Sequence, residues 1–446
     1  MKIWLFKKRL TLFVVLFSIT SVSIVAFGGG TVLEPLGVSL SVSAKRTDNR
    51  DRIPDGYEIQ CERVKKEKDT VLRIAPRISF DKRTSERFKY YFEYSPSFTY
   101  HDNPRHGGEK REWLHSAKGD IEFNIAPMTI FRLSDLYIWN GEKDWYYDHD
   151  HKTCRCMPET QKDDYYENLL RPSIHTQLTA DDTFALSGLW RIKRYEKDYA
   201  ADRGDEDEYS LLAELMHKMN RNISYGLFVE YTAFDRTRDG KDADPFNTSG
   251  YPDIIDAGVQ YITMGVQASY DFLGDGNYVL LGRTGYNYIW YEADELDSDG
   301  MMGDSRLELS LHQLERTNGR LGLKYGKEYA DIFPYSSQKN LTLFGNIGRR
   351  FGKQGDLKLA ADVEYRTRRY GRFDIDPDAF SYSYYKDKYE GKKLDRDSIW
   401  IRLSAQYDVT DNFVVSGFYS YEDMDSDVDS SYSENVVGIS ATYRFL

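Results

Sequence analysis

Apolar and polar residues alternate along much of this chain, and the pattern is clearest in its final segment. Successive side chains of a strand point to opposite faces, so a period of two with one apolar face predicts a half-buried β-strand. In a soluble sandwich the apolar face would pack on a second sheet, whereas in a membrane barrel it would meet lipid and the polar face would line a watery lumen. The apolar face of the segment is Val437, Ile439, Ala441, Tyr443 and Phe445, and the other face is Gly438, Ser440, Thr442 and Arg444.

The same alternation recurs in segments that are longer than ordinary strands. Their polar faces carry full charges in mid-strand, as Lys118, Asp120 and Glu122 do. Strands of soluble sheets are usually about five or six residues long, whereas strands that cross a membrane need about 9–11. The length therefore favours a barrel. Further predicted strands cover residues 38–45, 72–79, 89–100, 117–125, 357–366 and 399–408.

The connections between the predicted strands alternate between short and long. Short periplasmic turns at one rim and long outer loops at the other are the organisation of outer-membrane barrels. We therefore predict an all-β fold, a single transmembrane antiparallel up-and-down β-barrel of about 18 strands with both termini periplasmic. Short connections are predicted at 81–87, 126–129, 179–182, 219–222, 273–276, 316–319, 351–355 and 409–412, and long ones at about 46–69, 101–116, 141–166, 194–207, 233–255, 292–304, 327–338, 370–396 and 422–433.

Three prolines fall inside predicted strands. A closed barrel offers no free edge at which the missing N–H group of a proline would be harmless. We therefore expect β-bulges at Pro76, Pro96 and Pro172.

The composition agrees with a barrel and excludes a helical membrane protein. Charged residues make up 30% of the 446 residues, and the mean hydropathy is -0.64. A barrel tolerates this polarity because only alternate strand residues must be apolar. Aromatic residues reach 15%, led by 36 Tyr, and tyrosine is a residue that membrane interfaces favour. The alternative is a soluble β-protein rich in tyrosine.

The N-terminus predicts export. Lys2, Lys7, Lys8 and Arg9 are followed at once by the apolar run 10–27. A basic region followed by an apolar region and small residues is typical of a secretory signal peptide. We predict a signal peptide at 1–26 and a barrel domain at 27–446, located in the outer membrane of a Gram-negative bacterium. A retained N-terminal anchor is the alternative, because the apolar run is just long enough to span a bilayer.

Charged and aromatic side chains are the candidate functional residues. The polar strand faces carry an excess of cations, although the whole chain has a net charge of -12. Facing charges can set the solute preference of a pore, or they can pair with one another and hold the wall rigid. Aromatic loops suit the apolar faces of sugar rings, and they equally suit a plug. The candidate lumen cations are Arg283, Lys324, Lys358, Arg366 and Arg402, and the loop aromatics are Trp145, Tyr146, Tyr147, Tyr384 and Tyr385.

The cysteines and histidines predict neither a metal site nor an active site. The chain has 3 Cys, namely Cys61, Cys154 and Cys156. In an exported protein a disulfide from Cys61 to one of the other two is expected. A metal site formed by this pair with His149 and His151 is the alternative, but the spacing matches no standard zinc pattern. The 8 His lie outside any recognisable nucleophile motif, so we predict no enzyme activity, no metal and no cofactor.

Two short motifs carry a resemblance to a known family. Glu34-Pro35 precedes the first predicted strand, which ends at Thr47-Asp48-Asn49, and Glu434-Asn435-Val436-Val437-Gly438-Ile439 leads to Tyr443-Arg444-Phe445. With these motifs and the alternation of strands and turns between them, the chain resembles the type 2 family of β-barrel porins. That family includes outer-membrane barrels associated with exopolysaccharide secretion. The resemblance implies a barrel of about 18 strands that passes or exports a polysaccharide, without catalytic residues. The last strand also resembles the assembly signal of outer-membrane barrels, with Tyr443 and Phe445 as its aromatic residues.

The predicted function is an outer-membrane conduit for an extracellular polysaccharide. A general or solute-selective porin and a plugged structural or adhesive barrel are the alternatives. The partners expected are outer-membrane lipid and lipopolysaccharide, the barrel assembly machinery, an anionic polysaccharide and a periplasmic export apparatus. No nucleic-acid partner is expected.

The disulfide can be tested by digestion without reduction. If Cys61 is bridged to Cys154 or Cys156, protein taken from the cell surface should give one linked peptide pair and one free thiol, both visible by mass spectrometry. Three free thiols would rule out the bridge.

Overall fold

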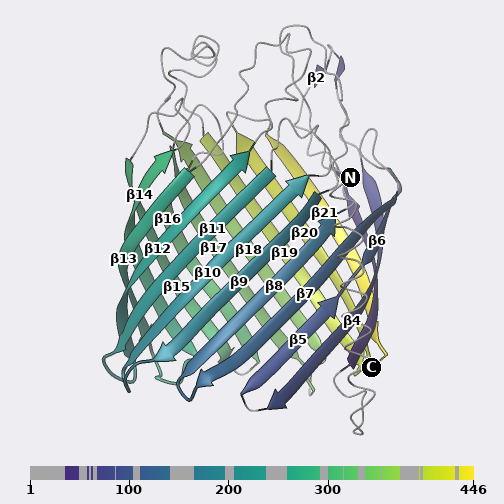
Figure 1. Cartoon of the computed structure of the whole chain (residues 1–446). Helices are drawn as coiled ribbons and strands as arrows, with labels where there is room; N and C mark the ends of the chain where they lie inside the picture. Colours follow the sequence, from purple (N-terminus) through teal and green to yellow (C-terminus); the bar gives the residue numbers. More distant parts are fainter. Residues whose placement is uncertain are drawn as a thin grey trace, which may run out of the picture.

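Long antiparallel strands make up nearly all of the described structure (Figure 1). The computed structural model describes residues 36–49, 58–59, 62–63, 68–85, 87–103, 111–140, 165–195, 205–237, 259–291, 300–314, 316–329, 337–352, 354–371, 391, 395–426 and 431–445. Among these residues, no helix is long and apolar enough to cross a membrane.

Each long strand pairs with the strands before and after it in the chain. The strands of this sheet are β1 (Leu36–Thr47), β4 (Asp69–Ser85), β5 (Phe88–Tyr94), β6 (Ser97–His101), β7 (Arg111–Ala126), β8 (Thr129–Asn140), β9 (Tyr165–Gln177), β10 (Asp182–Tyr195), β11 (Asp205–Lys218), β12 (Ile223–Thr237), β13 (Val259–Asp271), β14 (Tyr278–Tyr291), β15 (Gly300–Leu314), β16 (Thr317–Tyr329), β17 (Ser337–Phe351), β18 (Leu357–Tyr370), β19 (Asp395–Thr410), β20 (Phe413–Ser426) and β21 (Tyr432–Arg444). The two-residue strands β2 (Glu58–Ile59) and β3 (Glu62–Arg63) pair only with each other.

The sheet closes on itself through its first strand. β1 pairs with β4 on one side and with β21 on the other. The sheet contains 19 strands, but β5 and β6 both pair with β4 and β7 and are two halves of one barrel strand. The described barrel therefore has 18 strands. An even number lets the first and last strands meet antiparallel, and the predicted closed barrel is confirmed.

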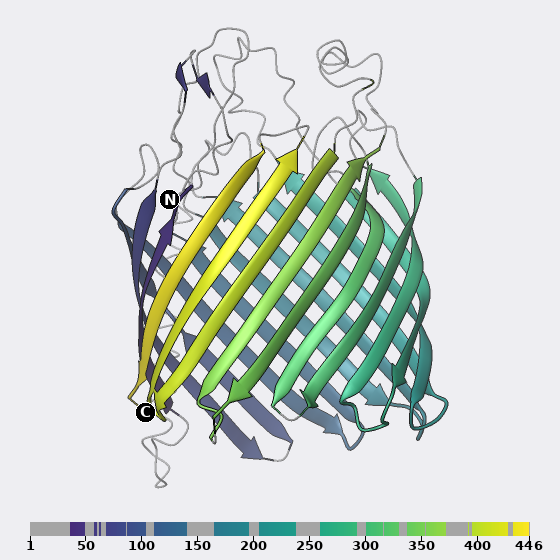
Figure 2. The same cartoon turned by 180° about the vertical axis from the view of Figure 1, so that it is seen from behind.

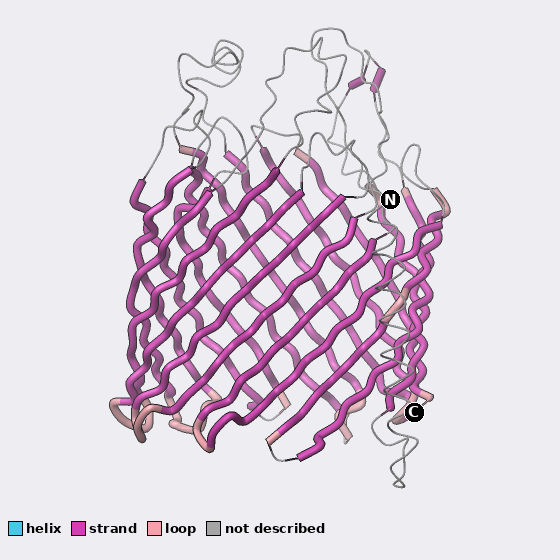
Figure 3. Tube along the Cα trace, in the orientation of Figure 1, coloured by secondary structure: helices cyan, strands magenta, loops and turns pink. Residues whose placement is uncertain are grey.

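The two rims differ as the sequence predicts. Turns of two to six residues, such as 127–128 and 219–222, join the strands at one rim (Figure 3). The connections at the other rim are longer, apart from the five residues 427–431 between β20 and β21. β21 ends at the short-turn rim (Figures 1 and 2). β1 begins there as well, because the Phe445 backbone N–H donates to the carbonyl of Val38 at 2.8 Å.

The turn at 272–277 shows how side chains fix a short connection. Gly274 and Gly276 have φ values of 67° and 78°, which lie in the left-handed region that favours glycine. The Asp271 carboxylate accepts from the backbone N–H of Gly274 at 2.9 Å. The Asn277 backbone N–H donates to Asp275 at 3.0 Å, and this bond lowers the pKa of Asp275 from its ordinary value.

Several strands extend further towards the long-connection rim than the sequence predicts. β15 begins at Gly300, β19 begins at Asp395 and β20 ends at Ser426, within stretches that the sequence assigns to loops. A strand that rises above the lipid meets water on both faces, so it loses the alternation from which strands are predicted. The acidic residues Asp207, Asp423 and Asp425 therefore belong to strand ends rather than to loops.

The expected β-bulges at the prolines are absent, and the expectation was wrong. Ile78 pairs with Tyr94 and Ile74 pairs with Phe98, so the two paired segments share one register. In that register Pro76 and Pro96 lie directly opposite each other. The two missing N–H groups thus fall at a single gap, which separates β5 from β6. At Pro172 the pairing with β10 also lapses and then resumes in the same register. The register shifts of the described ladder lie near short turns instead: Arg83/Ser85, Asn124/Ala126, Leu311/Leu314 and Asp408/Thr410.

The outer face of the wall is apolar and bordered by aromatic side chains. Ile439 is 59% exposed and Leu321 64% exposed, a degree of exposure that only a lipid environment makes favourable for so many large apolar groups. Exposed aromatic residues mark both ends of this belt, as in outer-membrane barrels. The chain is therefore an outer-membrane β-barrel. Exposed aromatic residues include Trp113, Trp190, Tyr209, Tyr286 and Tyr288 towards the long-connection rim, and Tyr225, Tyr270, Phe351, Tyr407 and Tyr443 towards the short-turn rim.

The seam between β1 and β21 is held by side chains from the two motifs that carry the family resemblance. The backbone N–H of Asn435 donates to Asp48 Oδ1 at 2.7 Å, and its side-chain amide donates to Asp48 Oδ2 at 2.8 Å. The Thr47 hydroxyl donates to the Glu434 carboxylate at 2.7 Å. The first and last strands are thus joined at the long-connection end by side chains in addition to the backbone ladder.

The two faces of the wall should respond differently to an added charge. Ile439→Arg and Leu359→Arg place a cation in lipid and should lower the free energy of unfolding by about 2–4 kcal/mol, measured by urea unfolding in lipid vesicles. Ser440→Arg places the same cation on the inner face and should cost much less. Equal losses for Ile439→Arg and Ser440→Arg would mean that the two faces are assigned the wrong way round or one residue out of register.

Candidate functional site

The inner face of the wall is the candidate functional site because the charged side chains of the strands gather there. In the described ranges the buried apolar side chains are only Val71, Phe228 and Tyr432, so the described barrel has no packed apolar core. All five predicted lumen cations lie on this face, alternating with exposed apolar residues such as Leu323, Leu359 and Leu403 on their own strands.

Four of the inner cations form a line across adjacent strands. Arg283 of β14 is directly opposite Arg306 of β15, and Arg306 is directly opposite Lys324 of β16. Thr342 of β17 then links Lys324 to Arg366 of β18. We call Arg283, Arg306, Lys324 and Arg366 the cation row. Like charges directly opposite each other destabilise a sheet, so this arrangement needs compensation.

Carboxylates and aromatic rings supply part of that compensation. Arg283 forms an ion pair with Glu230 at 2.9 Å, and its guanidinium lies 3.6 Å from the centroid of the Phe228 ring. Arg306 pairs with Glu308, and Arg366 pairs with Glu364 at 2.8 Å.

Two donors of the cation row lack a partner. The Nε groups of Arg283 and Arg306 are buried and have no hydrogen-bond partner within the part of the chain that the structure describes. A buried donor without a partner carries a free-energy cost. The two arginines are therefore not fully compensated by the described side chains.

The other two predicted cations lie outside the row. Lys358 is directly opposite Arg350 and Gln406, towards the short-turn rim. Arg402 is directly opposite Asp362, and its guanidinium lies 4.3 Å from the centroid of the Phe418 ring. The five predicted cations are thus brought to one face but not to one cluster.

Three inner phenylalanines lie over glycines of neighbouring strands. A Cβ atom added to Gly322 would be 2.3 Å from the Phe344 ring, and one added to Gly438 would be 2.3 Å from the Phe418 ring. Phe228 is only 2% exposed and covers both Gly265 and Gly285 in the same way. An aromatic ring that covers a strand glycine restores the packing that the glycine lacks. The rings also provide surfaces for arginines, including Arg283 and Arg402.

Sequence reasoning missed Arg306, Arg368 and Arg396, which lie on the same inner face as the predicted cations. Arg396 was assigned to the end of a loop, and the predicted strand at 357–366 stopped short of Arg368. A signal for Arg306 was present, because Leu307, Leu309 and Leu311 alternate with Arg306, Glu308 and Ser310.

The remaining candidate residues divide into two groups. Tyr443 and Phe445 are 44% and 56% exposed on the outer face, with ring centroids 4.9 Å apart. Their role as an assembly signal stays a prediction. The predicted loop aromatics and disulfide cysteines lie outside the described residues: Trp145, Tyr146, Tyr147, Tyr384, Tyr385, Cys61, Cys154 and Cys156.

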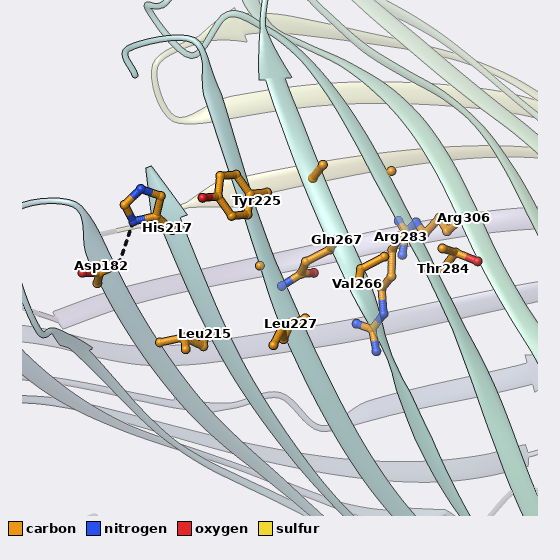
Figure 4. Close-up of a pocket in the computed structure, with 13 residues that line it drawn as sticks. Asp182, Leu215, His217, Tyr225, Leu227, Val266, Gln267, Arg283, Thr284 and Arg306 are labelled. Atoms are coloured by element: carbon orange, nitrogen blue, oxygen red, sulfur yellow. Dashed lines mark hydrogen bonds and ion pairs between the residues drawn. The ribbon is translucent and has the colours of Figure 1, made fainter. Parts of the chain in front are cut away.

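A cavity of about 720 Å³ touches this part of the wall but is not the candidate site (Figure 4). Leu215, Leu227 and Val266 line it, and their side chains belong to the exposed apolar outer face. Arg283 and Arg306 of the cation row also line it, so its lining includes residues of both faces of the wall. Near the short-turn rim it is bordered by His217, whose Nδ1 lies 2.8 Å from Asp182 Oδ1.

Comparisons with known proteins give structural likeness only. No protein-family model matches the chain, and no curated protein sequence matches it. Among solved structures, the chain is similar to the outer membrane protein OpdK of Pseudomonas aeruginosa, with 9% identity, 93% of this chain and 100% of that chain covered, and a TM-score of 0.46. OccK8 (OprE) of the same organism is 10% identical, with 93% and 99% covered and a TM-score of 0.46. The siderophore receptor PirA, also from Pseudomonas aeruginosa, is 9% identical, with 92% and 80% covered and a TM-score of 0.46.

The glycines under the inner phenylalanines should not accept a side chain. In Gly265→Ala the new Cβ would lie 2.2 Å from the carbonyl oxygen of Thr284 and 2.6 Å from the Phe228 ring. We expect the variant to lose about 1–3 kcal/mol of unfolding free energy through overpacking, measured in lipid vesicles. The matched control is Gly119→Ala, where no heavy atom lies within 4 Å and the change should stay within about 0.5 kcal/mol. Equal stability of the two variants would contradict the packing.

Proposed function

We propose that this outer-membrane barrel is a channel that passes anionic solutes along its inner wall. In this proposal the long connections face the outside of the cell and both termini are periplasmic. The observation that carries the proposal is the cation row, in which Arg283, Arg306 and Lys324 lie directly opposite one another on three consecutive strands.

The cost of the cation row is the first argument for a solute with negative charge. Each pair of like charges directly opposite in a sheet is unfavourable, on a scale of about 0.2–1 kcal/mol per cross-strand pair. A wall that only needed rigidity would be more stable with alternating signs along the row.

The electrostatics of permeation is the second argument. An anion that crosses a low-dielectric wall needs counter-charge along its path, and charged side chains lining a pore supply it. The carboxylates beside the row, Glu230, Glu308 and Glu364, pair with Arg283, Arg306 and Arg366 and weaken this field.

The resemblance to the type 2 porin family supports an extracellular polysaccharide as the solute, and the cation row favours an acidic one. A periplasmic export apparatus would then deliver the polymer to the short-turn rim. A solute-selective porin for small anions is the second candidate, and it is favoured by the same cation row.

Charge reversal separates these candidates. We expect the triple variant Arg283→Glu, Lys324→Glu and Arg366→Glu to lose anion preference in planar bilayers while the folded barrel still reaches the outer membrane. If the solute is a polysaccharide, its secretion should fall as well; if the solute is a small anion, secretion should stay unchanged. The control is Lys45→Glu, Arg73→Glu and Lys118→Glu, which makes the same charge change on other strands of the inner wall. If the cation-row variant changed neither conductance nor secretion, the channel proposal would be wrong and a plugged barrel would be favoured.

A further inference from the structure

The cavity of about 720 Å³ extends over the outer face of β10 to β14 (Figure 4). Its inner-face residues Gly226, Gln267 and Arg283 each stand in the chain between two outer-face lining residues, so their backbone lies at the floor of a recess in the outer face. We call the outer-face part of the cavity the outer groove. It consists of two neighbouring rows of directly opposite residues, one with Asp182, His217, Tyr225, Ala268 and Gly282 and one with Leu215, Leu227, Val266 and Thr284.

Small side chains open the outer groove. Ala268 is directly opposite Gly282, so only a methyl group and a hydrogen atom project from the wall at this point. A Cβ atom added to Gly282 would have a single neighbour within 4 Å, Leu307 Cδ1 at 3.9 Å. Leu227, at one side of the groove, is 59% exposed. Since this face of the wall meets lipid, the group that fills the recess and gains contacts there is an acyl chain.

The groove runs from the short-turn rim into the hydrocarbon. Asp182 is the first residue of β10, and His217 is next to the last residue of β11, so both lie at the short-turn rim. Gly282 lies deeper in the wall, because β14 begins at Tyr278. The row that joins these residues slopes because the strands of such barrels are tilted. One end of the groove is therefore at the level of the lipid headgroups and the other among the acyl chains.

The end of the groove at the rim is polar, and its groups are held in place by the protein. His217 Nδ1 lies 2.8 Å from Asp182 Oδ1, and it carries the hydrogen because a carboxylate only accepts. Asp182 Oδ2 accepts from the Thr179 hydroxyl at 2.6 Å. The His217 ring lies beside the Tyr225 ring, with centroids 5.3 Å apart. A fixed carboxylate, an imidazole and a phenol hydroxyl thus meet where the apolar groove begins.

This polar end decides which headgroup fits. An ethanolamine headgroup carries an ammonium next to its phosphate. The ammonium can donate to Asp182, and the phosphate can accept from the Tyr225 hydroxyl and from a protonated His217. The carboxylate would repel a headgroup that carries only negative charge, and a choline headgroup has no N–H group to donate.

We propose that the outer groove is a binding site for one molecule of phosphatidylethanolamine from the leaflet at the short-turn rim. An acyl chain lies along Ala268 and Gly282, and the headgroup lies against Asp182, His217 and Tyr225. The site is independent of the channel proposal, because its ligand comes from the membrane and not from the lumen.

Native mass spectrometry of the purified full-length barrel, with its lipid removed in detergent, tests the site. Added dioleoylphosphatidylethanolamine should form a one-to-one complex. Phosphatidylcholine and phosphatidylglycerol with the same acyl chains should bind about tenfold more weakly, the effect of one charge-assisted hydrogen bond.

Two variants address the two ends of the groove. Gly282→Phe fills the apolar part, and Asp182→Asn removes the charge that holds the ammonium, so each should weaken phosphatidylethanolamine binding about tenfold. The matched control is Gly119→Phe. Gly119 is a glycine of β7 on the same outer face, alternating with exposed Ile121, and an added Cβ would have no heavy atom within 4 Å. This variant should bind as the unaltered protein does.

The other outcomes would overturn the site. Equal binding of the three lipids would mean ordinary contact with the bilayer, and full phosphatidylethanolamine binding by Gly282→Phe or by Asp182→Asn would exclude the groove. If one variant fails to migrate as a folded barrel on gels without boiling, the other still decides the question. A dimer that is lost in Gly282→Phe but kept in Gly119→Phe, without lipid binding, would assign the groove to a second copy of the chain.

Discussion

The absence of water in the lipid bilayer is the constraint on which this structure depends. A strand edge in lipid would leave backbone N–H and C=O groups without partners, at a cost of several kcal/mol for each group. Closing β1 against β21 removes both edges that the described sheet would otherwise have. The seam is the least local pairing of the described sheet, because Asp48 and Asn435, which meet there, are 387 residues apart in the chain. Side-chain hydrogen bonds at that point add to the backbone hydrogen bonds between β1 and β21, which no short connection holds together.

Closure also decides where charge can reside. Once one face must meet lipid, every strand residue with a full charge must turn inwards or rise above the membrane. The ion pair between Arg194 and Asp207, at 2.6 Å, occupies the second kind of position near the long-connection rim. Most of the remaining charged side chains lie on the inner wall, where the pairing register of the strands places them in rows.

The alternation of apolar and polar residues was sufficient to predict the closed barrel and its two unequal rims. It also predicted that Arg283 and Arg402 lie on the inner face, because the face of a residue depends only on alternation along its own strand. It was not sufficient for the cation row. Whether Arg283 lies opposite Arg306 depends on the pairing register between two strands, which turn geometry sets and single-strand patterns do not contain. The pairing of Pro76 with Pro96 escaped sequence reasoning for the same reason: each proline alone predicts a bulge, and only the register shows that one gap serves both.

The tilt of the strands turns the cation row into a path rather than a ring. Directly opposite residues lie on a line perpendicular to the strands, and strands of such barrels tilt by about 35–45° from the barrel axis. With neighbouring strands about 4.8 Å apart, the four strand steps from Arg283 to Arg366 shift the row along the axis by roughly 12 Å. A ring of cations would give a solute one site at one depth. In the proposed channel, a sloping row would give an anion successive sites at different depths. Arg366, at the end of the row, also lines a cavity of the inner wall together with Arg368, Arg396 and Trp400.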